Sequence, residues 1–193
     1  MYTIIVPIVK DKKGDLSSKD NYRPIAITSI FSKVFEVLIL DKYGEKLYKT
    51  TCNQFGFKKK SSTDLCVFAL KEIVNSYIRQ SSPVFICFID ASKAFDRVCH
   101  WLLFKKLIGR LPILIIRLLV YWYTHQQFFT KWGNCMSKGF HVTNGVRQGG
   151  VMSPVLFNIY MDDLSRKLSK LRTGCNLNGK CMNHLIYADD MVL

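Results

Sequence analysis

Acidic side chains are scarce in this 193-residue sequence, which holds 14 Asp and Glu residues against 28 Lys and Arg residues. Residues 1–60 contain 12 basic and 6 acidic side chains, and the remainder contains 16 and 8, so the excess is not confined to a tail. A basic balance spread through a globular chain favours a polyanionic partner, most often nucleic acid. A basic protein without such a partner remains the alternative at this point.

Other absences exclude several protein classes. The seven cysteines form no Cys-x-x-Cys pair and no Cys/His cluster with zinc spacing, which argues for reduced thiols in an intracellular protein, nuclear or cytoplasmic. The apolar run near the N-terminus lacks a basic region before it and a small-residue cleavage site after it, so no signal peptide is expected. The run at 111–123 is short for a membrane span and contains Arg117, so we expect a core helix and no membrane partner.

The hydrophobic periodicity predicts a mixture of helices and strands. A strand is expected at 3–9, a polar loop at 10–24, and short strands within 125–150. Helical spacing of apolar residues predicts helices at 28–48, 64–79, 97–108, 112–124 and 153–171. Residues suited to cap three of these helices are Thr28 or Ser29, Asp96 and Ser153. The continuous apolar run Val84–Ile89 predicts a strand buried on both faces, which ends at Asp90.

Two segments carry the same pattern, Tyr-x-Asp-Asp, at 160–163 and 187–190. The first lies within a 3.6-residue apolar stripe, so Asp162 and Asp163 are expected on the solvated face of a helix. The second lies between two short apolar runs, which predicts a tight hairpin with Asp189 and Asp190 at its tip. A polar hairpin tip without further function is the simplest interpretation of the second segment taken alone.

Asp90 gives the second segment a chemical role. If the strand that ends at Asp90 pairs with the hairpin, three carboxylates meet at one edge of a sheet. Adjacent carboxylates repel one another unless a cation lies between them. Such a cluster suits two Mg²⁺ ions and phosphoryl transfer, which leaves both a polymerase and a metal-dependent nuclease open.

Three blocks of the sequence resemble motifs A, B and C of reverse transcriptases, in the right order. They are "FIDASKAFD" (88–96), "NGVRQGGVMSPVLFNIYMDDL" (144–164) and "HLIYADDMVL" (184–193). Upstream, "VPIVKDKKGD", "NYRPIAITSIFSKVFE" and "QFGFKKKSSTD" resemble the finger motifs of the non-LTR (LINE-type) retrotransposon branch. The resemblance covers nearly the whole chain.

The resemblance implies a role for individual residues. Asp90, Asp189 and Asp190 would be catalytic and would bind two Mg²⁺ ions. The incoming dNTP would be bound by Lys10 and Arg23 at its triphosphate, by Phe95 near its sugar, and by the loop residues Gln148 and Gly149. Nucleic-acid contacts would come from Arg147 and from Lys58, Lys59 and Lys60, for which an exposed charge is the alternative.

The resemblance also implies a fold and a reaction. The expected fold is α+β, a polymerase palm with a small antiparallel sheet backed by helices, plus a fingers subdomain. Residues 1–82 would form fingers and 83–193 a partial palm, with a return to the fingers around 125–145; the thumb would be absent, as if the domain were truncated after motif C. The expected function is RNA-directed DNA polymerase, with an RNA template, a DNA primer and dNTPs as partners. A nuclease needs no nucleotide gate such as Phe95, and a catalytically dead remnant that at most binds nucleic acid is the remaining alternative.

Overall fold

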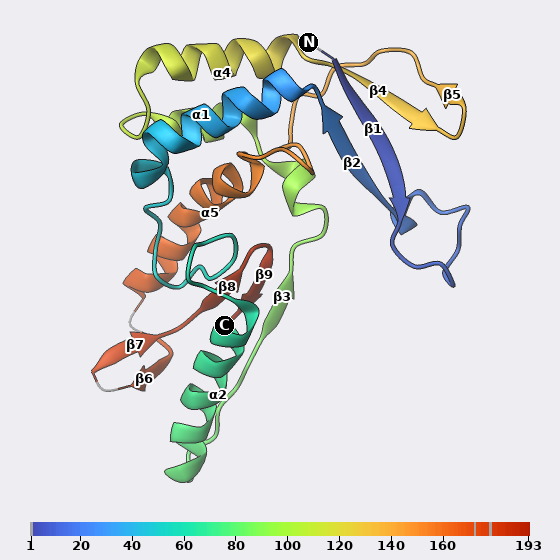
Figure 1. Ribbon diagram of the computed structural model, residues 1–193. Coiled ribbons are helices and arrows are strands. Elements are labelled where there is room, and N and C mark those ends of the chain that lie inside the picture. The colour runs from blue at the N-terminus through green and yellow to red at the C-terminus, as the bar shows by residue number, and fades with distance from the viewer. Residues whose placement is uncertain (1, 172, 178) are drawn as a thin grey trace. The chain divides into compact units, whose positions relative to one another are not determined.

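The computed structural model describes residues 2–171, 173–177 and 179–193, and its helices and strands confirm the α+β class (Figure 1). The chain divides into two compact units, which are described separately. Unit 1 comprises residues 1–46 and 95–153, and unit 2 comprises 47–94 and 154–193. These units are defined by packing alone, so the boundaries between fingers and palm stay a prediction.

Unit 1 is built on a four-stranded sheet in the order β2-β1-β4-β5 (Figure 1). Its strands are β1 (Tyr2–Val9), β2 (Tyr22–Thr28), β4 (Gln127–Trp132) and β5 (Cys135–Met136). β1 is antiparallel to β2 and parallel to β4, and β4 is antiparallel to β5. β2 begins inside the segment expected to be a loop; its Pro24 is tolerated because β2 is an edge strand.

The helices of unit 1 follow the predicted apolar periodicity. They are α1 (Ile30–Leu47, of which Leu47 belongs to unit 2), α3 (His100–Leu107) and α4 (Ile113–His125). Ser29 caps α1 as predicted, because its hydroxyl accepts a hydrogen bond from the Ser32 amide at 3.3 Å. The capping prediction for Asp96 is wrong: a 3₁₀ turn at Ala94–Arg97 precedes α3, Cys99 occupies the N-cap, and Asp96 instead accepts a hydrogen bond from Gln148.

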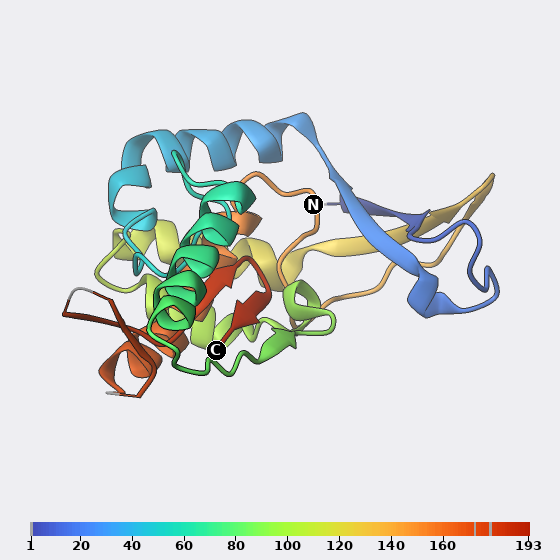
Figure 2. The same cartoon turned by 90° about the horizontal axis from the view of Figure 1, so that it is seen from below.

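Unit 2 contains a three-stranded antiparallel sheet in the order β3-β9-β8. Its strands are β3 (Phe88–Asp90), β8 (Leu185–Tyr187) and β9 (Asp190–Val192), and a separate hairpin is formed by β6 (Cys175–Leu177) and β7 (Lys180–Met182). The helices are α2 (Thr63–Arg79), capped by Ser62, and α5 (Ser153–Lys170). Figure 2 shows the same elements from below, with α2 beside the sheet, where it contacts β8.

The strand before Asp90 differs from its prediction. β3 is only three residues long, and Phe85 and Phe88 are 91% and 72% exposed rather than buried. The reason is its place in the sheet: β3 is an edge strand that, among the described residues, pairs with β9 alone. The apolar run therefore predicted the strand correctly, but the prediction that both of its faces are buried is wrong.

No helix among the described residues is long and apolar enough to cross a membrane. The apolar helix α4 instead buries Ile116, Leu119, Trp122 and Tyr123. This agrees with the prediction of a core helix for that run.

A buried ion pair organises the loop that precedes α5. The Glu36 carboxylate on α1 accepts a hydrogen bond from the Arg147 guanidinium, and both side chains are almost fully buried. Its other oxygen accepts hydrogen bonds from the Val151 and Met152 amides, at 2.6 and 3.1 Å. Glu36 thereby satisfies two amides just before α5, whereas the Ser153 hydroxyl, predicted to cap this helix, has no hydrogen-bond partner among the described residues.

We predict that Glu36→Ala lowers the free energy of unfolding by about 3–5 kcal/mol, because it leaves the buried Arg147 charge uncompensated. Urea denaturation measures this change. Glu45→Ala, an exposed position on the same helix, is the matched control and should change stability by less than about 0.5 kcal/mol. Equal losses in the two variants would contradict the structural role of Glu36.

Candidate active site

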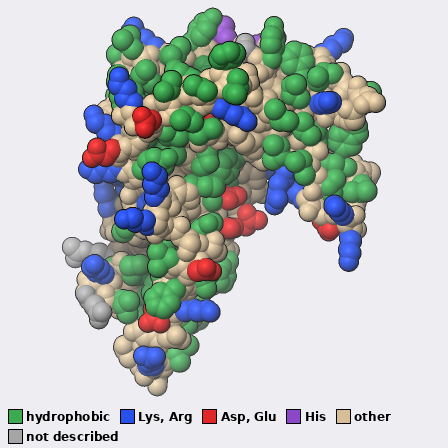
Figure 3. Space-filling view, in the orientation of Figure 1, with side chains coloured by type: hydrophobic (Ala, Val, Ile, Leu, Met, Phe, Trp, Pro, Cys, Tyr) green, Lys and Arg blue, Asp and Glu red, His purple; other side chains and the backbone are tan. Residues whose placement is uncertain are grey.

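The antiparallel register of unit 2 brings the three predicted catalytic aspartates to one edge of the sheet. Asp90, the last residue of β3, lies opposite Asp190, the first residue of β9. Directly paired residues on antiparallel strands have side chains on the same face, with Cβ atoms about 5 Å apart. Asp189 immediately precedes Asp190 in the turn between β8 and β9. Figure 3 shows acidic side chains gathered over this end of β3 and β9.

The electrostatics of this edge are unfavourable for three free carboxylates. Partial desolvation raises the pKa of Asp190 above its ordinary value, and the negative charges of Asp189 and Asp90 raise it further. Burial and like charges both disfavour the ionised form, and a bound cation would oppose both effects. The donor chemistry therefore fits a divalent metal ion, since Mg²⁺ prefers carboxylate oxygens.

The described residues contain no group of three or more His, Cys, Asp or Glu side chains that is already arranged around one ion position. This does not conflict with the fit of the donor chemistry. Mg²⁺ is usually held by one or two carboxylates, with substrate phosphates and waters completing its shell. The protein part of such a site is incomplete by nature when no substrate is bound.

Several of the predicted nucleotide-binding residues lie together in unit 1. The Gln148 side chain donates a hydrogen bond to Asp96 at 2.9 Å, and the Val146 amide donates one to the Phe95 carbonyl at 2.8 Å. The Gln148 carbonyl accepts a hydrogen bond from Ala26 on β2 at 2.7 Å. The motif B loop is thus tied to the end of motif A and to β2.

Gly149 is required where this loop meets β2. Its φ is +109°, and a Cβ atom there would lie 2.9 Å from the Ala26 carbonyl oxygen. A side chain would meet both a steric clash and a backbone conformation that L-residues rarely adopt. The resemblance to motif B therefore has a physical basis at this position.

Lys10 and Arg23 project from the hairpin formed by β1 and β2. Ile8 pairs with Arg23, and Lys10 follows the end of β1, where its amide donates a hydrogen bond to the Asn21 carbonyl at 2.8 Å. Both residues are exposed, and the Lys10 ammonium donates a hydrogen bond to the Asp20 carbonyl at 2.8 Å. Both cations lie near the loop that joins β1 to β2, and their joint binding of one anionic group stays a prediction.

The predicted nucleic-acid contacts are placed differently from one another. Lys59 and Lys60 are exposed, whereas Lys58 is half-buried and its ammonium donates to the Thr51 carbonyl. Arg147 is 6% exposed, pairs with Glu36 and lies over the Trp122 ring, 4.3 Å from its centroid. That burial does not fit a phosphate contact, so the arrangement assigns Arg147 to holding the motif B loop.

Residues 10–193 match the family described as reverse transcriptase (RNA-dependent DNA polymerase). The chain belongs to the reverse transcriptase family. This is the family whose motifs the sequence resembles, and the match extends over both compact units.

Relatives of this reverse transcriptase domain come from retrotransposons. It is 31% identical over 177 residues to the probable RNA-directed DNA polymerase from transposon X-element of Drosophila melanogaster, covering 89% of this chain and 18% of the relative. It is 26% identical over 193 residues to the Pol polyprotein from a type-1 retrotransposable element R2 of Nasonia vitripennis, covering 99% of this chain and 18% of the relative. The domain thus spans less than a fifth of the length of these relatives.

Two solved structures share the fold of the domain. A telomerase from Candida albicans, in complex with a fragment of telomeric RNA, has a TM-score of 0.58 at 14% identity, covering 99% of this chain and 38% of that one. An apo telomerase from Candida tropicalis has a TM-score of 0.55 at 14% identity, covering 89% and 41%. At this identity the likeness shows the fold alone.

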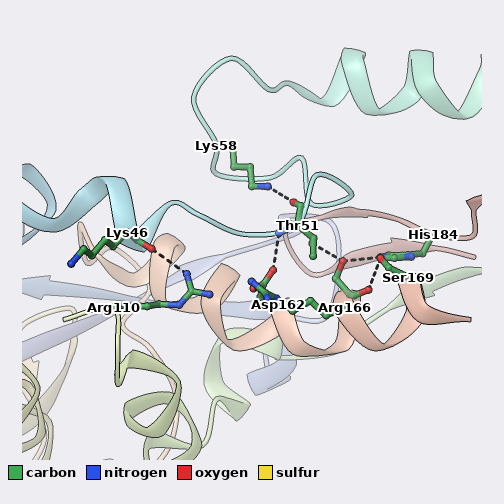
Figure 4. Close-up of polar contacts among 9 residues, drawn as sticks. Lys46, Thr51, Lys58, Arg110, Asp162, Arg166, Ser169 and His184 are labelled. Atoms are coloured by element: carbon green, nitrogen blue, oxygen red, sulfur yellow. Dashed lines mark hydrogen bonds and ion pairs between the residues drawn. The ribbon is translucent and has the colours of Figure 1, made fainter. Parts of the chain in front are cut away.

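The other Tyr-x-Asp-Asp segment lies inside helix α5, as its periodicity predicts, but only one of its aspartates is solvated. Asp163 is exposed, whereas Asp162 is 3% exposed and accepts hydrogen bonds from the Thr51 amide at 2.7 Å and from Arg166 at 2.8 Å (Figure 4). The prediction of a solvated Asp162 is therefore wrong. Its carboxylate holds the segment that begins at Thr51 against α5.

A chain of polar contacts continues from Thr51 to the strand that carries the second segment. The Thr51 hydroxyl lies 2.6 Å from the Ser165 hydroxyl, which lies 2.7 Å from His184 Nε2, and His184 directly precedes β8 (Figure 4). Asn53 donates to the His184 carbonyl at 3.1 Å. Burial lowers the pKa of His184, which favours a neutral ring in this network. The helical segment therefore supports the hairpin that carries Asp189 and Asp190.

Sequence reasoning did not find Glu36 or Thr51 as supporting residues. Each acts through hydrogen bonds to segments distant in the chain, and no periodicity, charge run or spacing marks such a partner.

We predict that Asp162→Ala costs about 1–3 kcal/mol of unfolding free energy, because it leaves the buried Thr51 amide without its acceptor. Asp163→Ala, one residue further on, should change stability by less than about 0.5 kcal/mol. Chemical denaturation of the two variants and the parent measures the difference. Similar stabilities of the two variants would show that Asp162 does not anchor this segment.

Proposed function

We propose that this domain carries the nucleotidyl-transfer site of an RNA-directed DNA polymerase encoded by a non-LTR retrotransposon. The observation that carries the proposal is the pairing of Asp90 with Asp190 beside Asp189. The family match and the retrotransposon relatives support the same reaction class. The proposed substrates are a dNTP, a DNA primer and an RNA template.

In the proposed reaction the primer 3′-hydroxyl oxygen attacks the α-phosphorus of the dNTP. A new P–O bond forms, the bond to pyrophosphate breaks, and the hydroxyl proton passes to solvent. Two Mg²⁺ ions, held by Asp90 and Asp189 with Asp190 beside them, would supply the charge that activates the attacking oxygen and stabilises the leaving one. The aspartates position this charge, since phosphoryl transfer depends mainly on placement and electrostatics.

The remaining roles are proposed for residues of unit 1. Lys10 and Arg23, near the loop end of their hairpin, would neutralise the triphosphate. Phe95 would lie against the sugar and disfavour a 2′-hydroxyl, while Gln148 and Gly149 would approach the incoming nucleotide. Lys59 and Lys60, which are exposed in unit 2, would contact the template backbone.

The net charge of +14 supports binding to a polyanion. The similar telomerase structure was solved with an RNA fragment, which supports an RNA template here as well. Nucleic-acid binding without catalysis is the second candidate function, because the positive net charge supports binding whether or not the aspartates catalyse a reaction.

We predict that Asp189→Asn reduces primer extension on an RNA template by at least about a hundredfold, because it removes a carboxylate that would hold the Mg²⁺ ions whose charge stabilises the transition state. Asp163→Asn, in the other Tyr-x-Asp-Asp segment, is the matched control and should extend the primer like the parent. Product length on a denaturing gel, measured with labelled primer, dNTPs and Mg²⁺, gives the rates.

Equal extension by Asp189→Asn and the parent would overturn the assignment of the site. Salt-dependent RNA binding by the parent with no extension would favour the binding-only function. Cleavage of RNA that requires Mg²⁺ but consumes no dNTP would indicate a nuclease.

A further inference from the structure

The turn that carries Asp189 contains a strained residue. Only Ala188 and Asp189 connect β8 to β9, and Ala188 has a φ of +58°. A non-glycine residue in the left-handed region costs of order 1 kcal/mol or more, and it persists only where the surroundings hold it. Ala188 is also buried, so other parts of unit 2 must satisfy its backbone groups.

The side chain of Gln54 satisfies both of those groups. Its carbonyl oxygen accepts a hydrogen bond from the Ala188 amide at 3.1 Å, and its NH₂ group donates one to the Ala188 carbonyl at 3.3 Å. The same oxygen also accepts a hydrogen bond from the Gly56 amide at 2.8 Å. Gln54 is 3% exposed, so this amide contacts the turn and not the solvent.

Gln54 is itself held firmly in place. The Phe55 amide donates to the Ile186 carbonyl at 2.7 Å, and the Ile186 amide donates to the Asn53 carbonyl at 2.8 Å, so residues 53–55 pair with β8 like a further parallel strand. The Asn158 side chain on α5 donates to the Gly56 carbonyl at 2.8 Å. A series of hydrogen bonds thus connects α5, through residues 53–56, to the turn at Ala188.

The approach of this segment to the turn is so close that position 56 must be glycine. A Cβ atom on Gly56 would lie 2.3 Å from the Ala188 amide nitrogen. Backbone of one segment therefore contacts backbone of the other. This contact and the amide of Gln54 act on the same residue of the turn.

We propose that Gln54 is a positioning residue for the metal site: its side-chain amide fixes the conformation of Ala188 and thereby the placement of Asp189 and Asp190. The inference rests on the proposed function of these aspartates. Gln54 acts on the backbone of the turn, as residues behind a metal site orient its ligands. Loss of its amide frees Ala188 while the flanking strand pairing remains.

The test uses Gln54→Met, which keeps the length of the side chain and removes its hydrogen bonds, in the 193-residue chain. Gln54→Glu keeps both acceptor bonds, from the Ala188 and Gly56 amides, and should therefore change the measurements below less than Gln54→Met does. Gln126→Met, which alters a buried glutamine of unit 1, is the control for loss of a buried amide. Thermal unfolding of all variants records their general stability.

Two measurements separate positioning from general destabilisation. Hydrogen exchange should accelerate at least tenfold at the Ala188 and Gly56 amides in Gln54→Met, whereas the Phe55 and Ile186 amides keep the protection of the parent. The affinity for Mn²⁺, measured by water proton relaxation, should fall about tenfold at the site that Asp189→Asn abolishes. Gln126→Met should leave both measurements unchanged.

Unchanged exchange at Ala188 together with unchanged Mn²⁺ affinity in Gln54→Met would overturn the inference. Parallel acceleration at all four amides would also overturn it, since that result indicates a purely structural role. If Asp189→Asn binds Mn²⁺ as tightly as the parent does, the proposed metal site is wrong. Hydrogen exchange at the Ala188 amide then decides by itself whether Gln54 fixes the turn.

Discussion

The repulsion among three carboxylates at one sheet edge is the constraint on which unit 2 depends. Antiparallel pairing places Asp90 against Asp190, and the turn adds Asp189. The pKa of Asp190 is raised first by partial desolvation and then by the negative charges of Asp189 and Asp90. A fold keeps such an arrangement only if other contacts hold the strands in register, because the charges alone would separate them. The buried side chains of Ile186 and Met191, on the opposite face of the same strands, supply part of that stability.

The two Tyr-x-Asp-Asp segments have different roles in unit 2. One forms the charged turn, and the other lies in helix α5 and anchors the segment that supports the turn. The connection runs from Asp162 through Thr51, Ser165 and His184 to the start of β8. The two segments share one sequence pattern but have different roles, because one has the apolar spacing of a helix and the other lies between short strands.

Periodicity predicted the helices well, since α1, α2, α4 and α5 lie close to the expected ranges. It also predicted the hairpin, because two apolar runs separated by Asp-Asp fit few other structures. The roles of Asp90, Lys10, Arg23 and Phe95 came from the resemblance rather than from any pattern.

What the sequence could not predict depends on tertiary contacts. The run before Asp90 looks like a buried strand, but its burial depends on which strands pair with it, and here it lies at an edge. Asp162 is buried and Arg147 is paired because of residues more than a hundred positions away. Charged residues at such positions resemble solvated ones until their partners are known.

The most direct test of the central claim is a crystal structure with an RNA–DNA template–primer, a dNTP that cannot react and Mn²⁺, in which anomalous scattering locates the metal. The proposed site predicts Mn²⁺ between the carboxylates of Asp90 and Asp189 and the nucleotide phosphates. Mn²⁺ bound elsewhere, with the nucleotide distant from Asp90 and Asp189, would contradict it.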